Sequence, residues 1–230
     1  MKRITIICMT IFISSYALAQ KHVTEFLGIP IDGSKSAMIQ KLKNKGFQYN
    51  STLDYLTGEF NGQKVNVHVV TNNNKVWRIM IQDVLSTRNE SDIIIRFNRL
   101  CSQFAKNKKY MPQDIEGKFE IDQGEDISIQ MSLYNKRYEA AYFQIFESDY
   151  DTTGASKIIM EKLQKTYTSE QINNLSEEEK MQFAVKSGIE ILLGKVSKRS
   201  VWFMIVEEYG RYSIIMYYDN EYNYADGEDL

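Results

Sequence analysis

The chain has very little cysteine, histidine or proline. Its 230 residues include two of each. Cys8 falls in an apolar N-terminal segment, so a processed chain would keep only Cys101 and could form no internal disulfide. No second cysteine or histidine lies at ligand spacing from Cys101, His22 or His68, so the sequence predicts no zinc site. The absence of a Pro-, Gly- or Ser-rich linker favours a continuously folded chain.

Motifs for several chemistries are also missing. The chain has no G-x-S-x-G or G-x-G-x-x-G element, which argues against common hydrolase and nucleotide sites. The segment 149–154 begins like a calcium loop, but Met160 stands where the loop needs a glutamate. Cys101 lies in the apolar stripe of a predicted helix, where a thiol is inert. We therefore predict no metal, no cofactor and no catalytic residue.

The N-terminus has the pattern of a secretory signal peptide. A basic start, Met1 to Arg3, precedes an apolar run over 4–15 and the small-residue site Ala17-Leu18-Ala19. We predict cleavage between Ala19 and Gln20, with residues 1–19 removed and the protein periplasmic or secreted. No later apolar run is long enough to cross a membrane, so we expect no span in the mature chain.

The mature chain would carry a small negative charge. Removal of Lys2 and Arg3 leaves 28 − 2 = 26 basic residues against 30 acidic ones, a net charge of −4. Nucleic-acid binding requires a basic patch or stripe. The charge balance therefore predicts no nucleic-acid partner.

Four helices are predicted from capping residues and apolar periodicity. They cover residues 34–45, 90–106, 155–165 and 176–194. In the last, Ser176 and Glu179 form a capping box, and Gly194 is expected to end the helix. Each helix should turn an apolar stripe to the core, and the stripes of the last two include Ile159, Met160, Leu163, Met181, Ala184, Val185, Ile189 and Leu192.

Strands are predicted between the helices. Residues 65–69 and 127–133 alternate apolar with polar, the period of a half-buried antiparallel strand. Hairpin turns are expected at 72–74, near 135–136 and near 209–210, with an earlier strand over 55–60. A weak repeat relates 33–42 to 154–163; the alternative is that any two amphipathic helices look this similar.

These elements predict an α+β fold, an antiparallel sheet with helices on one face, built from two or three helix-hairpin repeats. Two units are expected, 20–148 and 149–230, packed continuously with each other. The break near 149–154 could instead divide two domains.

Two segments carry a family resemblance. Residues 26–33, running on to 42–47, and residues 218–230 resemble a family of uncharacterised exported proteins from gut-type bacteria. That family carries no assigned catalytic residues, so none is transferred. The helix-hairpin order is similar to beta-lactamase-inhibitor-protein-like folds and to small outer-membrane assembly lipoproteins, whose members are binding proteins. The chain departs from the lipoproteins because it lacks their lipidated cysteine.

If helices cover one sheet face, alternate strand residues form the other. Apolar side chains among arginines are typical of a protein-contact surface, here His68, Arg78, Met80, Gln130, Arg137, Trp202, Met204 and Tyr217. The alternative is that Trp202 and Met204 are buried, because apolar residues alternate with them. We predict a non-enzymatic cell-envelope binding protein that contacts an envelope protein or glycan through this face. The alternatives are an envelope glycan- or peptide-acting hydrolase and a structural module.

Overall fold

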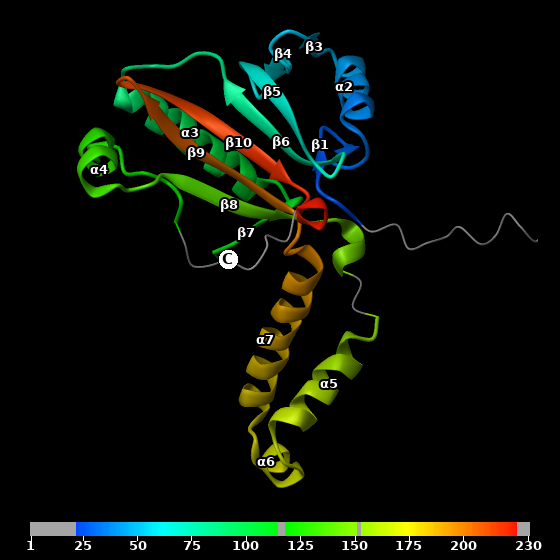
Figure 1. Cartoon of the computed structure of the whole chain (residues 1–230). Helices are drawn as coiled ribbons and strands as arrows, with labels where there is room; N and C mark the ends of the chain where they lie inside the picture. The colour runs from blue at the N-terminus through cyan, green and yellow to red at the C-terminus, as the bar shows by residue number, and fades with distance from the viewer. Residues whose placement is uncertain (1–21, 115–117, 151–152, 225–230) are drawn as a thin grey trace, which may run out of the picture.

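The computed structural model describes residues 22–114, 118–150 and 153–224 (Figure 1). The predicted signal peptide and its cleavage site lie outside these residues, as does Asp151 of the calcium-like segment. No helix in the described part is long and apolar enough to cross a membrane.

An eight-stranded antiparallel sheet forms the centre of the molecule. Its spatial order is β3 (Gln48–Asn50), β4 (Tyr55–Phe60), β5 (Gln63–Asn72), β6 (Lys75–Asp83), β10 (Arg211–Asp219), β9 (Ser200–Glu208), β8 (Glu139–Gln144) and β7 (Tyr110–Pro112). The C-terminal hairpin therefore lies between β6 and β8, so the segments before and after residue 149 share one sheet. A separate ribbon pairs β1 (Glu25–Phe26) with β2 (Ile29–Pro30).

The helices divide into two groups. The first contains α2 (Lys35–Asn44), α3 (Glu90–Lys106) and α4 (Ile127–Tyr134). The second contains α5 (Ala155–Thr166), α6 (Ser169–Asn174) and α7 (Glu177–Val196), which together extend away from the sheet as a helical arm (Figure 1). Two short 3₁₀ turns, η1 (Glu147–Tyr150) and η2 (Glu221–Asn223), lie at the end of the sheet where the arm begins.

The core lies between α3 and one face of the sheet. Phe97 of α3 is fully buried and meets the ring of Phe203 on β9 with centroids 5.2 Å apart. Alternate residues of each strand supply the sheet side of this core, as expected for period-two side chains; they include Val65, Val67, Val69, Ile79, Ile81, Val201, Phe203, Ile205, Ile214 and Met216. The structure thus confirms the predicted α+β class.

Several local predictions are confirmed. Helix α3 has the predicted bounds, with Asn89 as its N-cap. The hairpins at 72–74 and 209–210 are present as β5–β6 and β9–β10. Their turns hold Asn73, Asn74, Tyr209 and Gly210 at positive φ, the backbone that tight hairpin turns require. The capping box of Ser176 and Glu179 also forms.

The predicted strand over 127–133 is wrong, and so is the hairpin at 135–136. The segment forms α4, where the side chain of Asp126 accepts from the amide of Ile129. The Glu90 carboxylate accepts from the amide of Ile127 and so caps the same helix end. Asn135 ends α4 in the left-handed conformation instead of turning a hairpin. The hydrogen bonds that cap α4 come partly from a distant residue. They stabilise a helix where the alternation of apolar and polar residues predicts a strand.

The arm corrects a second set of predictions. Helix α7 continues past Gly194 to Val196, and α6 was not predicted at all, although Thr168 and Gln171 form a capping box for it. The predicted core residues Met160, Met181, Val185 and Ile189 are exposed. The apolar stripe of the arm is therefore real, but much of it lies outside the core.

Candidate functional site

The sheet face opposite α3 carries a row of side chains that crosses five strands. The strand register pairs His68 with Met80, Met80 with Tyr217, Tyr217 with Trp202, and Trp202 with Ala141. These residues alternate with core residues on every strand, so they share one face. We call this face the open face and this row the central row.

The open face is partly accessible to solvent. In Figure 1, α3 lies behind β10 and β9, and no described helix covers the near side of these strands. Trp202 and Met204 are half-buried, so the alternative that both are fully buried is wrong. Met80 and Tyr217 have the same intermediate exposure, and burial raises the pKa of the Tyr217 hydroxyl.

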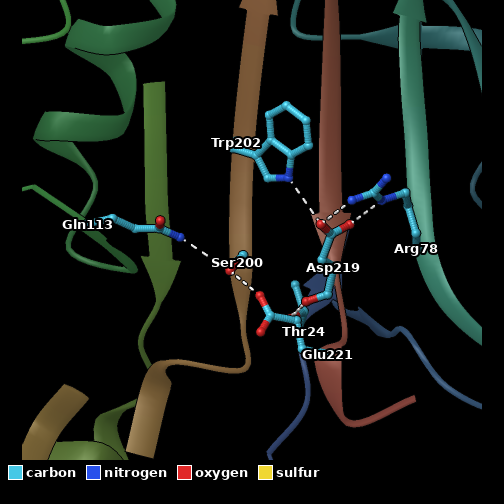
Figure 2. Close-up of polar contacts among 7 residues, drawn as sticks. All are labelled: Thr24, Arg78, Gln113, Ser200, Trp202, Asp219 and Glu221. Atoms are coloured by element: carbon cyan, nitrogen blue, oxygen red, sulfur yellow. Dashed lines mark hydrogen bonds and ion pairs between the residues drawn. The ribbon is translucent and has the colours of Figure 1, made fainter. Parts of the chain in front are cut away.

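An ion pair at one end of the open face fixes the aromatic side chains. Arg78 Nε lies 2.6 Å from Asp219 Oδ1, and Arg78 Nη2 lies 2.7 Å from Asp219 Oδ2. Trp202 Nε1 donates to the same Oδ2 over 3.0 Å (Figure 2). The Thr24 hydroxyl donates to the Asp219 carbonyl, which ties the segment just before β1 to the end of β10. Paired, bidentate contacts of this kind hold both partners in one orientation.

Aromatic rings surround the guanidinium of Arg78. Its central carbon lies 4.2 Å from the Trp77 ring centroid, 4.6 Å from Tyr217 and 5.6 Å from Trp202. Trp202 and Tyr217 stack with centroids 4.2 Å apart and planes 22° apart. Cation–π and stacking contacts thus add to the ion pair. The result is a preformed platform of two half-exposed rings beside a neutralised charge pair.

A shallow hollow of about 300 Å³ adjoins Trp202. It is lined by Gln113, Arg137, Glu139, Ala141, Ser200, Trp202, Asp219 and Glu221. Ser200 donates its hydroxyl to Glu221 Oε1 over 2.6 Å and accepts from Gln113 Nε2 over 3.2 Å (Figure 2). The hollow is at the small end of the size range of ligand pockets, so it suits a single side chain or a small polar group.

Arg137 lies at the rim of this hollow, just before β8. It pairs with Glu139 over 2.8 Å, and its Nη2 approaches the sulfur of Met204 at 3.9 Å. The structure thus places Arg78, Met80, Trp202, Met204 and Tyr217 on the open face, with Arg137 at its edge. Gln130, predicted for the same face, instead belongs to α4.

Sequence reasoning missed Asp219, Ser200, Glu221 and Gln113. The Asp219 side chain is 6% exposed and is the centre of the polar cluster. The alternation of β10 places Asp219 and Tyr217 on one face, which was a usable signal. Gln113 follows the end of β7 and Glu221 follows the end of β10, so strand alternation does not place either residue. Only the folded chain brings them to Ser200.

The carboxylate at the centre of the polar cluster on the open face is fully engaged in hydrogen bonds. Both Asp219 oxygens accept hydrogen bonds from Arg78 or Trp202. Cys101 lies in the core beneath the opposite sheet face from His68, and burial raises the pKa of its thiol to about 12. Within the described ranges, no group of three or more His, Cys, Asp and Glu side chains is placed to hold a metal ion.

No protein-family model matches the chain, and comparisons with curated proteins and with solved structures found no match.

Proposed function

We propose that this chain is an exported, non-enzymatic binding protein that contacts a protein or another component of the cell envelope through the open face. The export part of the proposal rests on the predicted signal peptide over residues 1–19. The binding part rests on the structure of the sheet.

The central row is the observation that supports binding. It leaves large side chains, above all Trp202, Tyr217 and Met80, half-exposed on a sheet face with no described helix over them. Tryptophan, tyrosine and arginine are the residues most enriched among those that dominate binding energy at interfaces. A continuous row of such side chains suits a partner surface better than solvent.

The fixed geometry of the platform adds to this argument. Stacking on Tyr217 and the hydrogen bond to Asp219 hold Trp202 in one orientation before any partner arrives. A side chain that is already ordered loses little conformational entropy on association. The hollow beside Trp202, with Arg137 at its rim, would then accept one polar or charged group of the partner.

Affinity capture with matched variants tests the proposal. The bait is the tagged chain from Gln20, which holds every described residue, incubated with an envelope extract of the producing cell. Trp202→Ala removes the central anchor. Tyr209→Ala is the control, because Tyr209 is fully exposed at the tip of the same β9–β10 hairpin.

We expect one species at a fixed stoichiometry with the unmodified chain and with Tyr209→Ala. With Trp202→Ala its recovery should fall at least about tenfold, since hot-spot truncations cost about 2 kcal/mol or more. Thermal melts of all three baits must first show that each is folded. Equal recovery by Trp202→Ala would remove the open face from consideration, and the absence of any species would count against binding.

A further inference from the structure

Helix α7 presents a line of large apolar side chains to solvent. Met181, Val185 and Ile189, spaced four residues apart, are 69%, 58% and 38% exposed; we call these three residues the α7 stripe. A shallow groove along the stripe is bordered on one side by Gln182, Lys186 and Glu190. Side chains spaced in this way lie one above another along a helix. The stripe is therefore a continuous ridge and not a set of isolated residues.

The α7 stripe lies away from the only described helix that packs along α7. Ser187 is buried, and Phe183 meets the ring of Tyr167, so this side of α7 faces α5. Glu190 on the same side pairs with Lys162 of α5. At 3.6 residues per turn, Val185 lies roughly opposite this side. The other described elements near α7 lie at its ends: η1 contacts it where Lys195 donates to the Asp149 carbonyl, and α6 directly precedes its first turn (Figure 1).

We propose that the α7 stripe packs against the same stripe of a second copy of this chain, with the two α7 helices antiparallel. The stripe is symmetric about Val185. A two-fold axis at that residue places Val185 against its own copy and Met181 against Ile189 of the copy. Such an isologous contact closes after two subunits. The surface is separate from the open face, so the inference goes beyond the proposed function.

The charges of α7 favour the antiparallel arrangement. Glu177, Glu178 and Glu179 occupy the first turn, and Lys195 lies in the last turn. Glu177 and Lys195 lie on the same flank of the helix, since they are five full turns apart. An antiparallel copy brings each glutamate cluster near Lys195 of the other copy, whose ammonium also donates to the Asp149 carbonyl of its own chain. A parallel copy would instead place the three glutamates of one chain beside the three of the other. The helix dipoles also align favourably when antiparallel.

The shape of the arm allows this contact. Helix α7 has 20 residues, which corresponds to about 30 Å. It extends clear of the sheet along most of that length (Figure 1). A single apolar ridge matches the groove of another helix, at the usual interaxial distance of about 8–10 Å. The other face of α7 keeps its contact with α5.

Sedimentation equilibrium of the chain from Gln20 tests the proposal. We expect a reversible dimer between about 1 and 100 µM protein, the range appropriate to a modest interface. Val185→Glu should weaken dimerisation by about 100-fold or more, because two unpaired carboxylates would be buried at the axis. Leu133→Glu is the control. Leu133 is 67% exposed on α4, so this change should leave the dimer intact.

Cysteine pairs test the orientation. Cys101 is buried with a raised pKa, so it should not react. When Met181→Cys and Ile189→Cys chains are mixed under oxidation, an antiparallel dimer gives a mixed disulfide, and neither chain alone gives one. Cross-linking of each chain with itself would overturn the antiparallel arrangement. A chain that remains monomeric up to about 100 µM, or a dimer that Val185→Glu leaves intact, would overturn the α7 interface.

Discussion

Helices α3 and α7 both carry apolar side chains at helical spacing, but α3 is the more strongly amphipathic of the two, and only its apolar stripe is buried against the sheet. Both carry an apolar stripe at helical spacing and an N-cap from a polar side chain. In α3 the stripe is buried against the sheet, with Phe97 and Leu100 fully buried. In α7, which is longer, the described side chains include only two buried ones, Ser187 and Val196.

An amphipathic pattern encodes only part of how a helix packs. The pattern indicates that a helix has a partner along one side. It does not indicate whether that partner belongs to the same chain. For α3 the partner is the sheet, through contacts such as Phe97 with Phe203. For the α7 stripe the partner proposed above is a second copy.

The largest effect is expected from Phe97→Ala. Its ring is fully buried against Phe203, and such truncations cost about 3–5 kcal/mol through lost transfer energy and a cavity. Urea unfolding monitored by circular dichroism measures the change. Phe183→Ala in the arm is the comparison, because Phe183 is only half-buried, near Tyr167. An equal loss of unfolding free energy in both variants would contradict the conclusion that the core lies between α3 and the sheet and that the arm lies outside it.

A smaller effect is expected from Gly58→Ala on β4. A β-carbon at Gly58 would lie 2.7 Å from Phe47 Cε1, and Phe47 is buried. Overpacking of this kind costs about 1–3 kcal/mol. Gly124→Ala is the control, since a β-carbon there meets nothing within 4 Å. A Gly58→Ala protein as stable as the control would show that the Phe47 ring can move without cost.

Much of the fold followed from local chemistry. The helix over 90–106 was predicted from the apolar stripe that includes Phe97, and the β5–β6 turn was predicted from its three asparagines. The segment over 127–133 could not be assigned in this way. Its cap includes Glu90, which is 37 residues away from Ile127 in the sequence, and single-sequence periodicity contains no such contact.

The site was predictable to a similar extent. Strand alternation grouped Met80, Trp202 and Tyr217, because side chains two residues apart on a strand share a face. The same rule did not identify Asp219, since its role depends on Arg78 from β6 lying next to β10. That neighbour is set by the insertion of the C-terminal hairpin between β6 and β8, which no local pattern reports.

The pH dependence of the protein's stability should contain a contribution from His68. Partial burial on the open face lowers its pKa below the ordinary value; Lys35 acts in the same direction, and Asp54 opposes both. The folded state therefore favours the neutral ring. Its stabilising contribution is complete above the unfolded pKa of about 6.5 and declines as the pH falls from there toward the folded pKa. Melting temperatures of the unmodified chain and His68→Gln from about pH 7.5 to 5 measure this. The His68→Gln profile should be flatter, and parallel profiles would refute the assignment.

The smallest effect is expected from Val185→Ala, and its dependence on concentration is informative. In an isolated chain Val185 is 58% exposed, and alanine has the higher helix propensity, so the unfolding free energy should change by less than about 0.5 kcal/mol. Association stabilises the folded state by mass action. Urea unfolding at about 1 µM and at about 100 µM protein should therefore give different results, with a larger loss at the higher concentration. A change that is small at both concentrations would mean that the α7 stripe has no partner in a second copy. A loss at low concentration as large as that of Phe97→Ala would place Val185 in the core of a single chain and remove the contrast with α3.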